Sequence, residues 1–348
     1  MRAAGVRHVM AFRSGHRDAS AYAGPAAIFT APYARLDDTA LLRHFSTRRG
    51  PHYAPVCEPH FQSDAFVADV MRDRYRFNGE TFQLDADFDW TWNPSSDIEW
   101  LIMLQKCYHF AGMGLYYERS GDERIRDKWM TLADRWLMQV EPGFIASDVA
   151  GRRIQNWIYA FHCFVEAAPQ PLPDAAFVRR YLGSLHAQTA WLHNNLTASR
   201  NHRTLELHAI FLVALVFPEL RDSPAWLEFA LSALAQNVSD DFLADGVHCE
   251  QSIFYHHVVL RNLLNVQRLA AWNGLPQPAA LRSRLRRALR FSLHVHRPDG
   301  VVPAFSDGDN ASFLDLLESA ADLYDDPELG FVASGGRSGR APRDTLAA

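Results

Sequence analysis

Two short polar segments have residue types that could bind a carboxylate or move a proton. The first, Ser199 to Arg203, precedes an apolar run and is predicted to open a helix. Asn201 suits the N-cap of that helix, whereas His202 and Arg203 do not, because cations are unfavourable at a helix N-terminus. A helix start that presents Asn, His and Arg is suited to binding an anion. We therefore expect Asn201 and His202 to contact a carboxylate, with Arg200 and Arg203 beside them.

The second segment runs from Asp245 to His257 and is predicted to be an Asp-Gly turn followed by a helix. Ser252, Tyr255 and His256 are three or four residues apart and would share one helical face. Polar groups are costly in a core unless they are hydrogen-bonded, so this stripe is expected to face a cleft. Phenol and imidazole groups can transfer protons. Glu250 precedes them near the first turn, where an acid is favourable.

Two further segments carry weaker signals. Arg153 and Trp157 stand near a predicted helix start and could bind an acidic sugar, or equally form a solvated helix end with a core Trp. The segment from Asp299 to Asp309 is an acidic loop whose spacing does not fit an EF-hand. No GxSxG, Walker A, GxGxxG or HExxH motif occurs. We expect no bound metal, because His248 and His256 lack an evident third ligand.

Bulk properties exclude several classes of protein. The 348 residues carry a net charge of -5, which argues against a general nucleic-acid binder. No run approaches the ~18 apolar residues of a membrane span, and the first twenty residues lack the apolar core of a secretion signal. Most of the nine Trp are expected in the core. The four cysteines show no CxxC spacing; free buried thiols are expected, with one disulfide left open.

The periodicity of the chain predicts an all-α fold. Residues 1–95 show weak periodicity and are expected to form an irregular arm, whereas a helix opens at Asp97 with Ser95 or Ser96 as its cap. Residues 326–348 are expected to be a disordered tail. Helical stretches with short connections imply antiparallel hairpins that close into a toroid or remain an open solenoid across 96–325. They are expected near 152–167, 174–198, 203–217, 223–240, 248–273, 277–296 and 311–324.

Taken together, these segments resemble the heparinase II/III-like polysaccharide lyases, including the related alginate lyases. That family has an Asn-His pair at a helix start, matched by Asn201-His202, and an Arg-x-x-x-Trp segment, matched by Arg153 to Trp157. A DG-x-x-P-x-x-x-D-x-D loop is matched by Asp299 to Asp309. The similarity spans roughly residues 75 to 315. The family's DG-x-x-x-E-x-S-x-x-Y-H segment is matched by Asp245, Gly246, Glu250, Ser252, Tyr255 and His256.

The resemblance implies an (α/α) toroid that cleaves a uronate-containing acidic polysaccharide by β-elimination. Asn201 and His202 would neutralise the uronate carboxylate as enolate charge builds. Tyr255 would act as acid, and on the appropriate epimer as base, while His256 would orient it or serve as base. No metal or organic cofactor is required by this scheme. Arg153, Trp157, Arg200, Arg203, Glu250 and Ser252 are expected to bind substrate.

The sequence departs from the family pattern after Asp309. About 40 residues remain, too few for the family's β-sandwich domain, which is therefore expected to be absent. This leaves open a truncated or inactive lyase, a homo-oligomer, or a partner chain that completes the cleft. The N-terminus predicts a cytoplasmic location, whereas the resemblance implies a periplasmic or secreted one.

Two other functions remain open at this point. A toroid glycoside hydrolase would need two carboxylates ~5–10 Å apart, for which Glu206, Glu250 and Asp307 are available. A non-catalytic toroid could instead bind acidic glycan through Arg153, Arg200 and Arg203.

Overall fold

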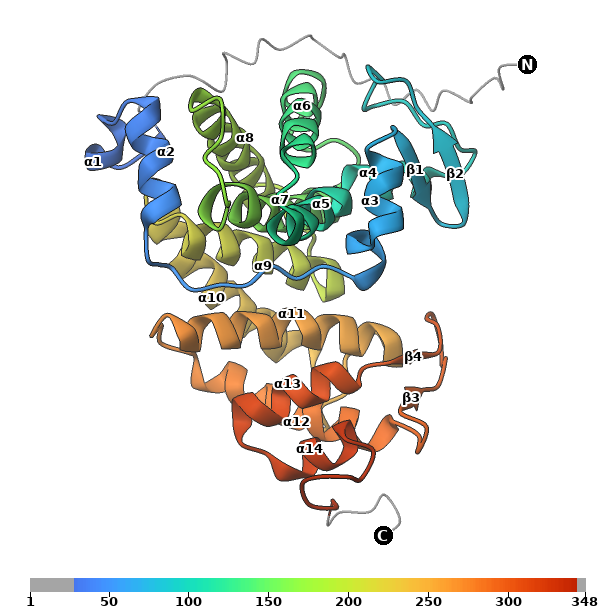
Figure 1. Ribbon diagram of the computed structural model, residues 1–348. Coiled ribbons are helices and arrows are strands. Elements are labelled where there is room, and N and C mark those ends of the chain that lie inside the picture. Colours follow the sequence, from blue (N-terminus) through green and yellow to red (C-terminus); the bar gives the residue numbers. More distant parts are fainter. Residues whose placement is uncertain (1–27, 343–348) are drawn as a thin grey trace. The chain divides into compact units, whose positions relative to one another are not determined.

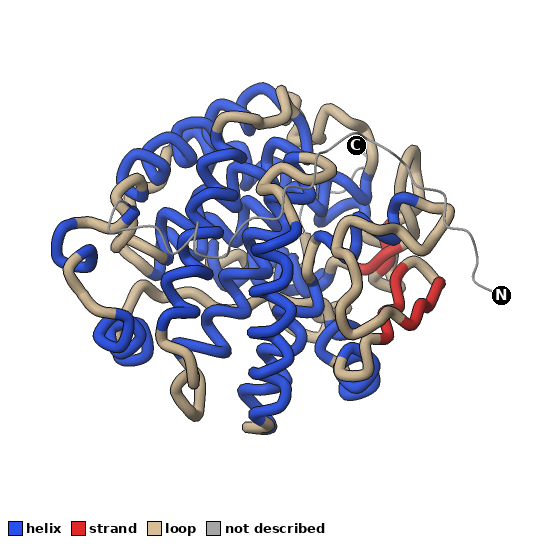
Figure 2. The backbone as a smooth tube through the Cα atoms, turned by 90° about the horizontal axis from the view of Figure 1, so that it is seen from above, coloured by secondary structure: helices blue, strands red, loops and turns tan. Residues whose placement is uncertain are grey.

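The computed structural model describes residues 28–342, and the chain over this range is mostly helical (Figure 2). The all-α prediction is therefore correct in class. The strands are confined to two antiparallel pairs, β1 (Arg74–Phe77) with β2 (Glu80–Gln83) and β3 (Val301–Val302) with β4 (Ala311–Ser312). The described range leaves out residues 1–27 and 343–348. The predictions made for the N-terminus and for the end of the tail concern these residues.

The N-terminal part is more regular than expected. Its helices are α1 (Ala31–Ala34), α2 (Asp38–Thr47) and α3 (Asp64–Val70), with a 3₁₀ turn at Pro59–Gln62. Asp37 caps α2 and Ser63 caps α3 through their side-chain oxygens. These helices are short and are joined by irregular segments, so they leave no clear periodicity in the sequence.

The following helices lie close to the predicted stretches, and each boundary has a local cause. Asp97 caps α4 (Ile98–Gln105), so neither Ser95 nor Ser96 is the cap. Cys107 takes a left-handed conformation with φ 55° and separates α4 from the next helix. The remaining helices of this region are α5 (Tyr108–Ser120), α6 (Glu123–Gln139), α7 (Ser147–Phe161), a π-helical turn η4 (His162–Glu166) and α8 (Ala176–His193).

The C-terminal part is also helical, and Figure 1 labels its elements. It contains α9 (Arg200–Val216), α10 (Ser223–Asp241), α11 (Ile253–Trp272), α12 (Ala279–Val295), α13 (Leu314–Tyr324) and α14 (Pro327–Ala333). Helix α14 falls within the expected disordered tail and is capped by Asp326, whose side chain accepts from Glu328 N and Leu329 N. The tail prediction therefore does not hold for these residues.

The described chain divides into two compact units. The first comprises the residues up to Leu196 together with Leu212–Trp226, and the second comprises Thr197–Phe211 and the residues from Leu227 onward. These divisions lie just before α9, within α9 and within α10, and not at residues 95 and 325. In the first unit α5 packs with α6 and α7, and α7 packs with α8. In the second unit α11 packs with α12 and α13, and α12 packs with α14.

Aromatic side chains dominate the core of the first unit. The Trp129 ring stacks on Phe164 with 4.3 Å between centroids, and Trp157 stacks on Tyr181 at 4.5 Å. Six of the nine Trp are buried, while Trp92 and Trp272 are exposed. This agrees with the expectation that most Trp are core residues. Aromatic burial on this scale stabilises the hairpins against each other, since each ring removes ~150–250 Å² from water.

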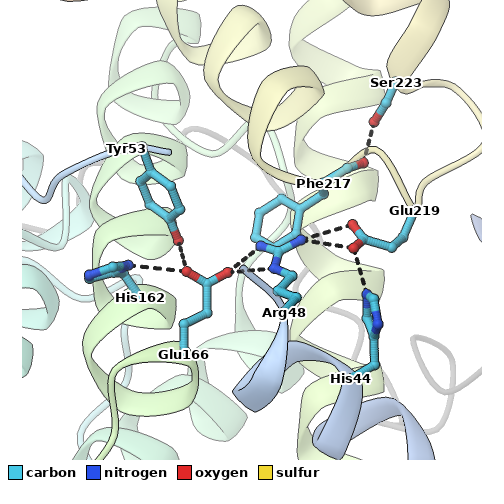
Figure 3. A network of polar contacts seen from close by, with 8 residues as sticks. All are labelled: His44, Arg48, Tyr53, His162, Glu166, Phe217, Glu219 and Ser223. Carbon is cyan, nitrogen blue, oxygen red and sulfur yellow. Dashed lines mark hydrogen bonds and ion pairs between the residues drawn. The ribbon is translucent and has the colours of Figure 1, made fainter. Parts of the chain in front are cut away.

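A buried ionic network ties α2 and its C-cap to the rest of the first unit (Figure 3). The guanidinium of Arg48 donates to both carboxylate oxygens of Glu219, at 2.9 and 3.0 Å, and to Glu166. Tyr53 and His162 bond the other oxygen of Glu166, at 2.6 and 3.1 Å. A pocket of about 190 Å³ opens beside Arg48, His162 and Glu166. The polar groups of the network satisfy one another, so they fix the N-terminal helices in place.

Within residues 28–342, no helix combines the length and apolarity needed to cross a bilayer. The four cysteines are free thiols, with Cys107 and Cys163 buried and Cys57 and Cys249 half-buried. The described residues therefore contain no disulfide, which the sequence had left open.

Candidate active site

The start of α9 is held by a carboxylate from the end of α10. Arg200 adopts φ 74°, a conformation that non-glycine residues seldom take. Its backbone N–H donates to the Oδ2 of Asp241 at 2.7 Å. Backbone strain of this kind persists where surrounding contacts enforce it, and it clusters at functional sites. The side chain of Arg200 is exposed.

Asn201 lies inside the first turn of α9 and does not serve as its cap, contrary to the simple expectation. Its Nδ2 instead donates to the carboxylate of Glu250, with distances of 2.8 Å to Oε1 and 3.0 Å to Oε2. Both side chains are half-buried. An ionised carboxylate only accepts hydrogen bonds, so this contact fixes which end of the Asn201 amide points toward Glu250. Glu250 therefore contacts a predicted site residue directly.

A tight hairpin positions Glu250. Phe242 and His248 form an antiparallel bridge, and Gly246 turns the chain with φ 91°. A Cβ on Gly246 would lie 2.5 Å from the carbonyl oxygen of Arg287, so only glycine fits this turn. His248 is fully buried, and its Nδ1 lies 3.5 Å from the Oε2 of Glu250. Burial lowers the pKa of His248, while the neighbouring Glu250 and Asp241 oppose that effect.

Helix α11 begins at Ile253, five residues later than predicted at residue 248. Gln251 takes φ 54°, and Ser252 caps the helix by accepting from the backbone N–H of Tyr255. The Ser252 Oγ also donates to the carbonyl oxygen of Asp307. Ser252 is buried and bonded on both sides, which gives it a structural role in place of the predicted substrate contact. Tyr255 is half-exposed in the first turn of α11.

His256 lies in the packed interface of α11 with α12. It is 1 % exposed, and its Nε2 donates to the carbonyl oxygen of Ala288 and to the Oγ of Ser292, at 3.2 and 3.1 Å. Burial, followed by the neighbouring His257, holds the pKa of His256 well below its usual value. A buried imidazole is poorly placed to act as base on a polysaccharide, which leaves the other predicted role, orienting Tyr255, as a proposal.

The other polar residues near the start of α9 differ in their exposure and in their hydrogen-bond partners. His202 is exposed, as its predicted role requires. Arg203 is half-buried and donates to the carbonyl oxygen of Thr197 at 2.8 Å. Glu206 is fully buried and accepts from the backbone N–H and the hydroxyl of Thr197, at 2.7 and 2.6 Å. Both residues therefore shape the loop before α9.

Arg153 and Trp157 belong to the first unit and are fully buried. The Arg153 guanidinium donates to Gln188 Oε1 at 2.7 Å and lies over the Trp136 ring at 4.5 Å from its centroid. Trp157 stacks on Tyr181. Their predicted contact with substrate is wrong for this conformation, and the alternative of a core Trp is correct.

The Asp299–Asp309 loop supports the α11 start and shows no cation site. Gly308 has φ 150°, and a Cβ there would lie 2.4 Å from Phe254 Cβ and 3.3 Å from Ser252 Oγ. Asp307 and Asp309 are exposed. Among the described residues, no three His, Cys, Asp or Glu side chains gather in a way that could hold a metal ion.

Asp241 was not among the site residues predicted from the sequence. Its only local signal is its place beside Asp240 at the end of a helical stretch, where an acid opposes the helix dipole and so calls for a specific partner. The partner is a backbone N–H of another segment, which no sequence pattern reveals.

A known protein family matches most of this chain. The model of the family "Heparinase II/III N-terminus" matches residues 58–329, which is most of the chain. The chain belongs to this family. The predicted resemblance to the heparinase II/III lyases is thereby confirmed.

Two curated relatives of this heparinase II/III family chain are named heparin-sulfate lyases. That of Pedobacter heparinus is 24% identical over 275 residues, covering 75% of this chain and 41% of the relative. That of Bacteroides thetaiotaomicron is 20% identical over 350 residues, covering 87% and 48%. The chain thus spans less than half the length of these relatives.

A crystal structure of heparinase III shares the fold of this family member. It is 19% identical, with a TM-score of 0.78 over 88% of this chain and 53% of the other. The helical toroid predicted from the sequence is confirmed by this match.

Proposed function

We propose that this heparinase II/III-type chain carries the β-elimination site of a polysaccharide lyase that acts on a uronate-containing acidic polysaccharide. The observation that carries this proposal is the bond from Asn201 to Glu250, which joins the start of α9 to the segment that leads into α11. The Asn201 amide is suited to bind a carboxylate. Its partner Glu250 lies five residues before Tyr255, whose phenol is half-exposed. Family membership and the heparin-sulfate lyase relatives support the reaction class.

The chemistry follows from the acidity of the sugar. The C5 proton of a uronate is weakly acidic, and its removal delocalises charge onto the carboxylate as an enolate. Donors that are already in place stabilise this charge, because they need not reorganise during the reaction. Asn201 and His202 supply those donors.

Tyr255 is the group that transfers the proton. As phenolate it removes the C5 proton, and as phenol it then protonates the departing O4, which leaves a 4,5-unsaturated uronate on one product. The double bond forms from the C5 electron pair as the C4–O4 bond breaks. Tyr255 lies at the N-terminus of α11, where the helix dipole stabilises a developing negative charge.

The two other functions predict different arrangements. A hydrolase needs an acid pair in contact with substrate, but Glu206 is buried against Thr197 and Glu250 is bonded to Asn201. A glycan-binding toroid that uses Arg153 is not supported, because that side chain is buried. Both observations favour the lyase.

Incubation with uronate polysaccharides tests the proposal. Heparan sulfate and alginate are mixed separately with the chain, and the ultraviolet absorbance of the unsaturated product is followed over time. A rise in absorbance on either polymer supports the lyase. New reducing ends without absorbance would indicate hydrolysis, and binding without either product would indicate a non-catalytic toroid; both results contradict the proposal.

A further inference from the structure

The Asn201 amide is bound to an anion before any substrate arrives. Its Nδ2 lies 2.8 and 3.0 Å from the two carboxylate oxygens of Glu250. A single N–H directed between the two oxygens is enough for both contacts, which leaves the second N–H of the amide for another acceptor. A uronate carboxylate that takes this second N–H must come to lie close to the carboxylate of Glu250.

The surroundings of Glu250 contain more acid than base. Asp241, at the end of α10, contacts the same helix start, where it accepts the backbone N–H of Arg200. In residues 28–342, no Lys or Arg forms an ion pair with Asp241 or Glu250. The thiol of Cys249 stays neutral, because burial, Asp241 and Glu250 all raise its pKa. The positive charge of Arg200 lies close enough to this cluster to lower the pKa of both His248 and Cys249.

His248 is placed to share a proton with Glu250. Its Nδ1 lies 3.5 Å from Glu250 Oε2 and accepts a hydrogen bond from the backbone N–H of Glu250 at 3.5 Å. The ring is fully buried, and no group in the described chain pairs with its Nε2. Burial keeps this imidazole neutral, while each added negative charge favours its protonated form.

We infer that binding of a uronate carboxylate at Asn201 is coupled to the uptake of one proton from solvent by the Glu250–His248 pair. This inference rests on the proposed function only in taking Asn201 as the carboxylate contact. The proton ends on a Glu250 oxygen, or on His248 Nδ1 once that nitrogen has given up the hydrogen bond from the Glu250 backbone N–H, and no bond of the sugar changes. It removes the repulsion between two carboxylates that share one amide, since like charges this close cannot both ionise freely.

The coupling has a defined consequence for affinity. When one proton is taken up for each sugar bound, the association constant rises up to about tenfold for each pH unit by which the pH falls. A chain without this coupling would show a weaker rise in affinity for the same uronate over the same pH interval. The pair therefore makes acidic conditions favour capture of an acidic glycan.

Calorimetry measures the proton directly. A heparan sulfate oligosaccharide is titrated into the Tyr255→Phe variant at pH 6.0, in buffers with different ionisation enthalpies. The dependence of the observed enthalpy on the buffer gives the number of protons taken up. We expect about half a proton or more per sugar bound. The same oligosaccharide with its carboxyl groups reduced is the matched ligand and should show no uptake.

Glu250→Gln is the decisive variant, because glutamine keeps the shape and the acceptor oxygen but cannot take up a proton. Uptake should fall to less than about a third of that in the parent, and thermal unfolding confirms that the variant is folded. Unchanged uptake in Glu250→Gln, or no uptake in the parent, would overturn the inference.

A second measurement tests the same inference when the affinity is too low for calorimetry. The ¹⁵N resonances of the His248 ring and the Asn201 side-chain amide are followed while glucuronate is added. Both should shift together in the parent, with the His248 ring moving toward its protonated form. A shift of neither resonance at saturating glucuronate would overturn the inference.

The two proposals fail in different ways. Unsaturated product without proton uptake would leave the lyase standing and remove the coupling. Proton uptake without product on any uronate polymer would leave the coupling standing and remove the lyase.

Discussion

The Oγ of Ser252 accepts a hydrogen bond from the backbone N–H of Tyr255 at 3.2 Å and thereby sets the first turn of α11. The same hydroxyl donates to the carbonyl oxygen of Asp307, so a loop more than fifty residues later fixes this helix start. Tyr255 is consequently held on a rigid turn while its side chain stays half-exposed. A proton-transfer group gains from such a fixed position.

Tyr255→Phe is expected to reduce turnover at least ~100-fold while leaving glycan affinity within a few-fold, because it removes only the phenol proton. The absorbance of unsaturated product gives the rate, and calorimetry gives the affinity. Tyr116→Phe, on α5 of the other unit, is the matched control and should keep full activity. Full activity of Tyr255→Phe would refute the role assigned to this residue.

His256→Gln is expected to lower stability and not the chemical step. Loss of the bonds to Ala288 and Ser292 in a buried site should reduce the free energy of unfolding by ~1–3 kcal/mol. The turnover number of the folded fraction should stay within a few-fold of the parent. Denaturant unfolding and product absorbance measure the two quantities. A large loss of turnover at unchanged stability would show that His256 has a catalytic role after all.

Acid should weaken the second unit through His257. This ring is buried and stacks on Phe313 at 4.4 Å, and burial lowers its pKa from 6.5 to about 4. The unfolded chain therefore binds this proton first, so stability is fully present above pH 6.5 and is lost as the pH falls toward 4. The expected loss is about 3 kcal/mol between those values. His257→Phe should flatten this part of the pH profile of unfolding; an unchanged profile would contradict the assignment.

Two glycines test the hairpin that positions Glu250. Gly246 and Gly274 both have positive φ, but a Cβ would meet the backbone of Arg287 at Gly246 and nothing within 4 Å at Gly274. Gly274→Ala should cost only the conformational strain, ~1–2 kcal/mol. Gly246→Ala should cost at least ~2 kcal/mol more, because the backbone must move. Unfolding of the two variants side by side checks this; equal losses would show that the hairpin can relax.

Much of the architecture could be predicted from the sequence, because it depends on local patterns. Long amphipathic helices such as α6 and α12 are visible from their apolar spacing, and turn residues mark their ends. The start of α11 was placed too early, because the positive φ of Gln251 and the cap at Ser252 interrupt a continuous helical pattern. Tertiary contacts decided these details.

The candidate site was predicted in part. Asn201, His202 and Tyr255 are half-exposed or exposed, in keeping with their predicted roles, which remain proposals. Spacing along a helix shows which side chains share a face, but not how deeply that face is packed. For this reason His256 and Arg153 looked available in the sequence and are buried in the structure.

The ionic network of Arg48, Glu166 and Glu219 imposes a rule on sequence change in this family. Replacement of Arg48 leaves two buried carboxylates without their shared guanidinium, at a cost of ~3–5 kcal/mol, whereas joint replacement of all three by apolar residues of similar volume can be neutral. The three positions are therefore expected to change together. A lineage is expected to keep all three residues or to exchange them together, and intermediates with one residue changed should be rare.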